Sequence, residues 1–136
     1  MAAPPPIAPS SRPRPVFRNI SPTDLRRYRL PLPGIVSILH RVSGALLFLF
    51  TWLVLWLLQA SVSDAAEFRA LYGNPPVKLI VFALLWSLLH HLCAGIRYLV
   101  MDVNHGATDL KAARQSAGIA VAVSLALTVI IGVKLW

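Results

Sequence analysis

The sequence predicts an all-α membrane protein with three transmembrane helices and a short amphipathic segment before the first of them. Of its 136 residues, 57% are hydrophobic and 13% are charged, whereas soluble domains are nearer half apolar and a quarter charged. The apolar excess lies in three runs, at about residues 35–60, 77–101 and 116–136. Each run reaches the roughly 20 residues that cross about 30 Å of hydrocarbon. We therefore expect three spans and no separate soluble domain.

The basic residues are spread unevenly around these runs and predict the orientation of the chain. The net charge is +8. The segment before the first run carries Arg12, Arg14, Arg18, Arg26, Arg27 and Arg29, whereas the opposite side has only Arg69, Lys78 and Lys134. By the positive-inside rule the N-terminus is expected in the cytoplasm and the C-terminus outside. In so apolar a chain, orientation and contact with anionic lipid or a partner explain the basic tail better than nucleic acid does.

Two segments are expected before the first span. Residues 1–15 form a Pro-rich, low-complexity tail that cannot build a packed core and is expected to be disordered. Residues 16–34 form a basic amphipathic pre-span segment, in which Ser21 at a helix N-cap predicts a short helix over about residues 22–28. The remaining unit, residues 35–136, is the expected three-helix transmembrane domain.

The positions of the acidic residues and of the single cysteine exclude several kinds of chemistry. All five acids lie outside the runs, at Asp24, Asp64, Glu67, Asp102 and Asp109. This placement argues against a transporter that relies on carboxylates within the membrane. Cys93 lies in the second run, where a lone thiol usually packs as a small hydrophobe.

Two adjacent histidines, His90 and His91, lie in the inner part of the second run. An ionisable residue at membrane depth is costly, and neutral imidazole is the commonest side-chain metal ligand. The helix face of His91 also carries the small residues Ser87, Ala94 and Gly95. These predict a shallow slot in which a flat ligand could approach, so we assign His91 as an axial haem ligand and His90, beside Trp86, as a packing neighbour. A hydrogen bond between helices is the alternative role for such a histidine, and spacing alone does not separate the two.

Two further residues lie about two turns closer to the cytoplasm, Arg97 and Tyr98. A guanidinium group suits a carboxylate, so Arg97 is a candidate partner for a haem propionate. For Arg97 alone, the favoured alternative is that its side chain reaches to the lipid headgroups.

The first run begins with an unusually polar stripe. Ser37, His40, Arg41 and Gly44 are spaced so that they share one helix face. A hydroxyl, an imidazole and a guanidinium just inside the membrane suit either a quinone carbonyl, which needs donors, or a haem propionate, which needs positive charge. The alternative is that Arg41 reaches to the headgroups while Ser37 begins the helix. The depths of His40 and His91 differ by only about 6 Å, so spacing leaves open an intrachain pair on one haem.

The motifs Ser-Ile-Leu-His-Arg-Val-Ser-Gly at 37–44 and His-Leu-Cys-Ala-Gly-Ile-Arg-Tyr-Leu-Val-Met-Asp at 91–102 carry a family resemblance. With Arg-Asn-Ile-Ser-Pro at 18–22, they resemble the cytochrome b subunit of bacterial succinate dehydrogenase, the larger membrane anchor of respiratory complex II. The resemblance covers about residue 14 to the C-terminus and implies a three-span fold that holds haem b.

The resemblance also implies a role for each matching residue. The haem ligand falls on His91, and the second axial ligand comes from a partner anchor subunit. The quinone-binding positions fall on Ser37 and Arg41, and His40 falls near the haem propionates. Tyr98 stands where related chains have a second histidine, so any propionate contact there would come from a phenol.

The function that the resemblance implies is a subunit, not an enzyme that acts alone. Electrons from succinate would pass through a flavoprotein subunit and an iron–sulfur subunit to ubiquinone, at a multi-pass anchor in the bacterial inner membrane. Two alternatives are a haem-free quinone-linked anchor and a non-redox assembly or interaction protein whose histidines only hold helices together.

Overall fold

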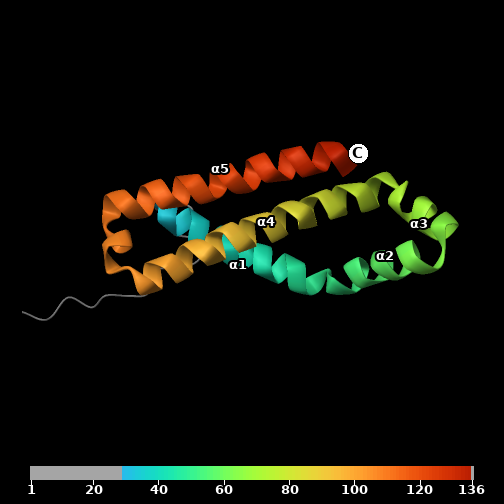
Figure 1. The fold of residues 1–136 in the computed structure, drawn as a ribbon, viewed down its shortest axis with the longest axis horizontal. Helices are drawn as coiled ribbons and strands as arrows, with labels where there is room; N and C mark the ends of the chain where they lie inside the picture. Colours follow the sequence, from blue (N-terminus) through green and yellow to red (C-terminus); the bar gives the residue numbers. More distant parts are fainter. Residues whose placement is uncertain (1–28, 136) are drawn as a thin grey trace, which may run out of the picture.

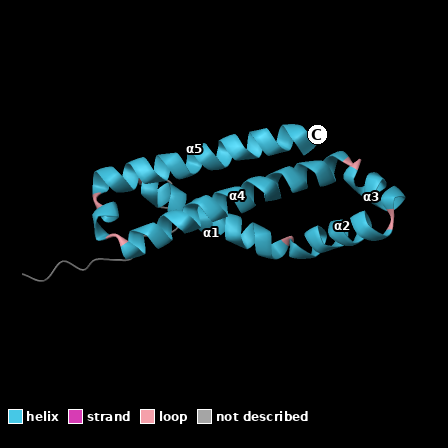
Figure 2. Ribbon diagram, viewed as in Figure 1, coloured by secondary structure: helices cyan, strands magenta, loops and turns pink. Residues whose placement is uncertain are grey.

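The computed structural model of the chain describes residues 29–135, and helices account for nearly all of them (Figures 1 and 2). The helices in order are α1 (Leu32–Leu49), α2 (Thr51–Ser63), α3 (Ala65–Tyr72), α4 (Pro75–Val103), the 3₁₀ turn η2 (His105–Thr108) and α5 (Leu110–Leu135). The predicted tail at 1–15 and the predicted helix at 22–28 lie outside the described residues.

Three of the helices are long and apolar enough to cross a membrane, which confirms the predicted fold class. They are α1 with 18 residues, α4 with 29 and the 25-residue stretch Leu110–Lys134 of α5. Helix α5 begins at Leu110, before the apolar run that starts at 116. Its first turns are polar, so the apolar pattern did not include them. Lys111 and Arg114 are exposed there, while Ala113 is buried. The chain is therefore a multi-pass helical membrane protein.

The first apolar run is interrupted at Phe50, where a single uninterrupted span was expected. Phe50 has φ −101° and ψ 10°, which ends α1 and lets α2 leave in a new direction. Its N–H still donates to the Leu46 carbonyl at 3.0 Å, and its own carbonyl accepts from Leu53 and Val54. The backbone therefore stays hydrogen-bonded at the break, as hydrocarbon requires. Helix α2 approaches α1 and α3 but not α4 or α5 within the described residues.

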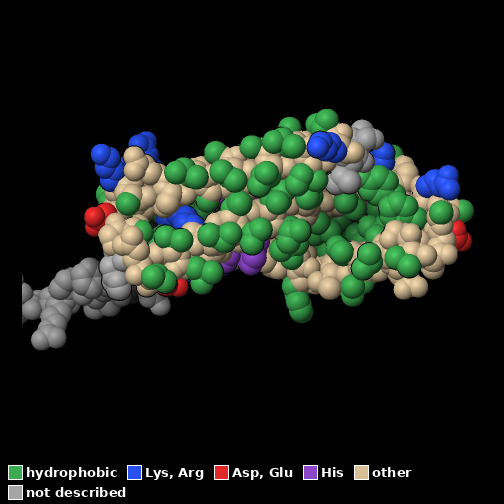
Figure 3. All heavy atoms as spheres, viewed as in Figure 1, with side chains coloured by type: hydrophobic (Ala, Val, Ile, Leu, Met, Phe, Trp, Pro, Cys, Tyr) green, Lys and Arg blue, Asp and Glu red, His purple; other side chains and the backbone are tan. Residues whose placement is uncertain are grey.

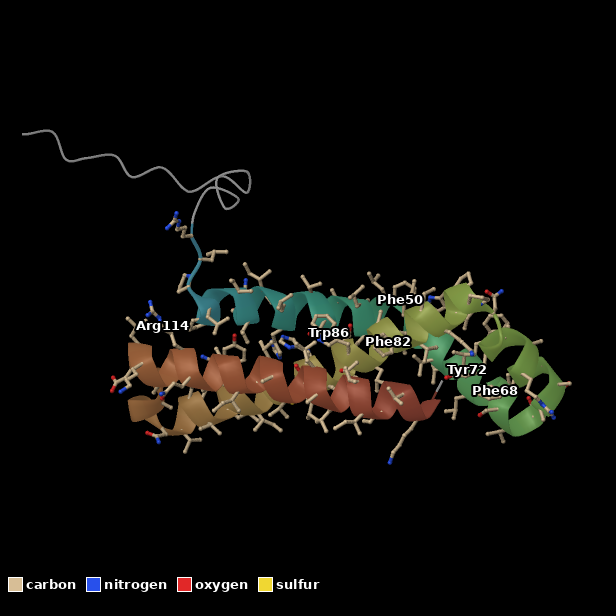
Figure 4. All side chains as sticks on the ribbon, turned by 90° about the horizontal axis from the view of Figure 1, so that it is seen from above. Phe50, Phe68, Tyr72, Phe82, Trp86 and Arg114 are labelled. Carbon is tan, nitrogen blue, oxygen red and sulfur yellow. The ribbon has the colours of Figure 1, made fainter. Side chains whose placement is uncertain are left out.

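The connection at 61–76 between the first two apolar runs contains a short helix, α3. The Asp64 side chain caps it by accepting hydrogen bonds from the N–H groups of Ala66 and Glu67, at 2.7 and 3.2 Å. Phe68 and Tyr72 stack with their ring centroids 5.6 Å apart. Figure 4 shows this aromatic pair at one end of the molecule and Arg114 at the other.

Helix α4 is the centre of the bundle because both α1 and α5 pack against it. The contact is close since small residues line it. Val36, Ala94 and Ala117, one from each span, are fully buried against one another. On α5 the small residues lie on different sides of the helix, because Ala120 and Ser124 are buried while Ala122 is exposed.

The outer surface of the bundle is apolar along its length. Figure 3 shows hydrophobic side chains over most of the visible face, with charged side chains mainly at the two ends. Leucine, isoleucine and valine side chains that are half exposed or more occur on all three spans. So large an apolar surface is unsuited to water and suits a hydrocarbon environment.

Arg97 joins α4 to α5 within the membrane. Its side chain is only 7% exposed. Its Nε donates to Ser116 Oγ at 3.0 Å and its Nη2 donates to the Ala113 carbonyl at 3.2 Å. The favoured expectation that Arg97 reaches out to the lipid headgroups is therefore wrong, because oxygens of α5 solvate the guanidinium group inside the protein.

Replacing Ser116 by alanine is expected to lower the free energy of unfolding by about 1–2 kcal/mol, because a buried charged donor loses its partner. Ser61→Ala is the matched control, since that hydroxyl is exposed and bonds only to the Leu58 carbonyl of its own helix. The control should stay within about 0.5 kcal/mol of the parent. Detergent-titrated unfolding of the purified protein measures both, and equal effects of the two variants would contradict the role of Arg97.

Candidate functional site

A polar contact between two spans joins His91 of α4 to α1. His91 Nδ1 lies 3.0 Å from the His40 carbonyl oxygen and 3.3 Å from Ser43 Oγ. The His40 and His91 rings stack with centroids 4.1 Å apart and planes 9° from parallel. Gly44 makes room for this contact, because a Cβ there would lie 2.8 Å from His91 Cε1. Residues 40–44 of α1 thus form the surface against which the His91 ring packs.

The hydrogen bonds around His91 fix which ring nitrogen carries the proton. The Ser43 hydroxyl donates to the His40 carbonyl at 2.9 Å, so its oxygen is left to accept. Both neighbours of His91 Nδ1 are therefore acceptors, and Nδ1 must be the donor. The lone pair of neutral His91 then lies on Nε2. The half-buried ring thus presents the nitrogen that a metal would bind.

The slot predicted beside His91 is filled by the protein itself. Ser87 and Ala94 are fully buried. The missing side chain of Gly95 leaves space that His40 Nε2 approaches, 3.7 Å from where a Cβ would lie. The small residues on this face therefore let the other two spans pack against α4, which the spacing of residues within one helix could not reveal.

His90 points to a different helix from its neighbour. Its side chain is fully buried. Its Nδ1 lies 3.4 Å from Ser124 Oγ on α5, and its ring stacks on Trp86 with centroids 5.2 Å apart. Trp86 lies between the ribbons of α1 and α5 in Figure 4. Successive helical residues point about 100° apart, so the two rings have different neighbours: His91 contacts α1, and His90 contacts Ser124 on α5, with the backbone of Val36 on α1 beside it.

Tyr98 completes the group of rings at this site. Its ring meets that of His40 edge to face, with centroids 5.3 Å apart. Its Oη is buried and has no hydrogen-bond partner among the described residues. A buried hydroxyl without a partner is costly, so this oxygen is suited to a polar group from outside the described chain. We refer to His40, His91 and Tyr98 as the ring cluster.

The four residues of the polar stripe on the first span do not all face the same neighbour. His40 and Gly44 face α4 and contact His91 or its surroundings. Ser37 is half-buried, whereas Arg41 is exposed on the outer side of α1. The structure therefore brings His40, His91 and Tyr98 together, leaves Arg41 on the surface, and holds Arg97 against α5.

His40 and His91 do not fit as the two axial ligands of one iron in the observed geometry. Two ligands of one iron must approach it from opposite sides, whereas the His40 and His91 rings lie face to face and nearly parallel. Among the described residues there is also no group of three or more His, Cys, Asp or Glu side chains that could hold a metal. Any metal at His91 would need ligands from outside these residues.

Three serines matter to the site and were not singled out in the sequence. Ser43 contacts His91, Ser116 binds Arg97, and Ser124 binds His90. The only signal for Ser43 was its place directly before Gly44 and three residues after His40. For Ser116 and Ser124 the partner lies on another helix, so no pattern within one helix could identify them.

The fold and the ring cluster define a class of protein, a three-span membrane subunit with a histidine site between its helices. The chain matches the family described as succinate dehydrogenase/fumarate reductase transmembrane subunit over residues 12–131, and it belongs to that family. It is 37% identical over 117 residues to the succinate dehydrogenase cytochrome b556 subunit of Coxiella burnetii, across 83% of this chain and 93% of that one. It is 33% identical over 120 residues to the protein of the same name from Paracoccus denitrificans, across 83% and 88%.

Substitutions of Gly44 and Gly95 by alanine are expected to change stability in opposite directions, and they test the helix contact at His91. In a helix, glycine to alanine alone stabilises by about 1 kcal/mol. At Gly95 the new methyl meets only an ordinary contact, so Gly95→Ala should stabilise or be neutral. At Gly44 it collides with the His91 ring, and overpacking costs about 1–3 kcal/mol, so Gly44→Ala should be neutral to destabilising. Detergent-titrated unfolding that ranks the two variants the other way round would exclude the arrangement.

Proposed function

We propose that the chain is the cytochrome b-type membrane anchor of a succinate dehydrogenase, which binds haem b through His91 and helps to form the ubiquinone-reduction site. The family and the names of the relatives support the anchor role. The observation that carries the haem assignment is the hydrogen bond from His91 Nδ1 to the His40 carbonyl. Metal-binding histidines typically donate their second ring nitrogen to a carbonyl or carboxylate in this way.

The donor chemistry of the site fits haem b. His91 presents the Nε2 lone pair, and its ring is held by the His40 carbonyl and by stacking on His40. His90 could not serve instead, because its ring is fully buried. Bound haem b would supply a one-electron redox centre, whose potential depends on its axial ligands and its surroundings. The second axial ligand comes, in this proposal, from a partner anchor subunit.

The haem propionates are expected near the remaining polar groups of the site. Tyr98 Oη is a buried donor without a partner among the described residues, which supports a contact with a carboxylate. His40 lies beside both Tyr98 and His91 and could share that contact. Arg97 remains a predicted propionate partner, although two of its nitrogens already donate to α5.

Ser37 and Arg41 are proposed to bind the quinone. Arg41 is exposed on α1, so a quinone or a partner subunit can reach its guanidinium group. One turn away, the Ser37 hydroxyl can donate a hydrogen bond to a quinone carbonyl. As the quinone is reduced, negative charge develops on its oxygens, and a cation and a donor already in place stabilise that charge.

The assembly that follows from this proposal has four kinds of subunit. A flavoprotein and an iron–sulfur protein would dock on the cytoplasmic side, near the basic segment before α1. The second membrane anchor would pack beside the ring cluster. The location proposed is the bacterial inner membrane, with the N-terminus in the cytoplasm. The two alternative functions are a haem-free anchor and a non-redox assembly protein. If the following experiments contradict the proposal, these two alternatives remain.

His91→Ala is expected to remove the b-type α-band from the dithionite-reduced spectrum of the purified complex, because the axial nitrogen is lost. Leu92→Ala is the matched control, since the next side chain along α4 is 55% exposed and faces away from the cluster. The control should keep the haem content of the parent. A parent complex without haem absorption, or a His91→Ala complex with a full α-band, would contradict the assignment.

Arg41→Ala is expected to lower succinate:quinone turnover by roughly 100- to 1,000-fold, as removal of one charge-stabilising donor does elsewhere. Reduction of a soluble dye by the flavoprotein and iron–sulfur subunits should persist, because it does not use the membrane site. Arg69→Ala, an exposed arginine on α3 at the other end of the bundle, is the control. Unchanged quinone turnover in Arg41→Ala would remove Arg41 from the quinone site.

A further inference from the structure

His90 is a fully buried imidazole for which the proposed function has no use. Its Nδ1 lies 3.4 Å from Ser124 Oγ on α5. Its ring stacks on Trp86 with planes 19° apart, and the backbone of Val36 on α1 lies beside it. Burying a polar ring at membrane depth is costly, and a leucine would fill the same space without that cost. A polar ring at this buried position therefore indicates a role that depends on its polar contact.

The contact between His90 and Ser124 has a defined direction. The Ser124 hydroxyl donates to the Val121 carbonyl of its own helix at 2.9 Å. Its oxygen is therefore left to accept, and His90 Nδ1 donates to it across the gap between α4 and α5. This is a contact between helices, unlike that of Thr128, whose hydroxyl donates to the Ser124 carbonyl of its own helix at 2.7 Å.

We propose that His90 is a positioning residue for His91: its contact with Ser124 fixes the rotation of α4 about its axis and so holds the His91 ring in place for iron. This inference rests on the proposed haem function. The two histidines are neighbours on one helix. His91 is held by α1, whereas His90 is held by Ser124 on α5 and also lies beside the backbone of Val36 on α1. The contact with Ser124 therefore ties α4 to a second helix besides the one that holds His91.

The geometry shows why a small rotation matters. A side-chain tip lies about 5–6 Å from the helix axis, so a turn of about 10° moves it by about 1 Å. A displacement of that size would lengthen the 3.0 Å bond from His91 to the His40 carbonyl beyond hydrogen-bonding distance. The hydrogen bond that orients the ligand therefore depends on the rotation that His90 fixes.

The test uses the purified complex and the integrity of the iron–His91 bond as its readout. Carbon monoxide binds reduced haem only where an axial ligand is loose or absent, and the low-spin electron paramagnetic resonance signal broadens when ligand orientation varies. The variants are Ser124→Ala, His90→Phe, which keeps a stacked ring without the donor, and their combination. Thr128→Val is the matched control, because Thr128 is equally buried one turn further along α5.

Ser124→Ala and His90→Phe should each raise the carbon monoxide-reactive fraction of haem several-fold and broaden the resonance signal. The double variant should add nothing further, because both changes remove one contact, and Thr128→Val should match the parent. If Ser124→Ala retains full haem with the reactivity and linewidth of the parent, the positioning role is overturned and haem binding stands. If the His90→Phe complex does not assemble, the result for Ser124→Ala alone tests the positioning role. A parent complex without haem overturns both proposals.

Discussion

The close approach of α1 and α4 at Gly44 is the constraint on which the rest of the site depends. Only a residue without a side chain allows the His91 ring to reach the backbone of α1, where the His40 carbonyl accepts a hydrogen bond from His91 Nδ1. That bond fixes the tautomer of His91 and the direction of Nε2. The stacking of His40 on His91 and the edge contact of Tyr98 follow from the same approach.

The surrounding protein satisfies most of the polar groups that hydrocarbon would not, although His90 Nε2 and Tyr98 Oη have no partner among the described residues. Arg97 is bound by oxygens of α5, His90 by Ser124, and His91 by α1. Each of these hydrogen bonds joins two different helices. The bonds therefore offset the cost of burying the polar groups and also fix how the helices pack. In the anchor proposed above, this packing would also determine which ring faces the haem. The polar groups of the interior thus connect the assembly of the bundle to the function proposed for it.

The three spans could be predicted from apolar length alone, because the bilayer sets that length. The break at Phe50 could not, since neither proline nor glycine marks it. Within the site, the choice of His91 over His90 as haem ligand stays a prediction. The structure shows that His91 is the less buried ring and that the slot expected beside it is filled by the protein. Positions within one helix show which residues share a face. They do not show which helix covers that face, so the partners Ser43 and Ser124 became visible only in three dimensions.

The most direct test of the proposed haem site is a cryo-electron microscopy map of the assembled complex at a resolution that shows side chains. We expect haem density joined to His91 Nε2, with His91 Nδ1 within hydrogen-bonding distance of the His40 carbonyl and the opposite ligand contributed by another chain. Iron joined to His40 or His90, or a complex with no haem beside α4, would contradict it.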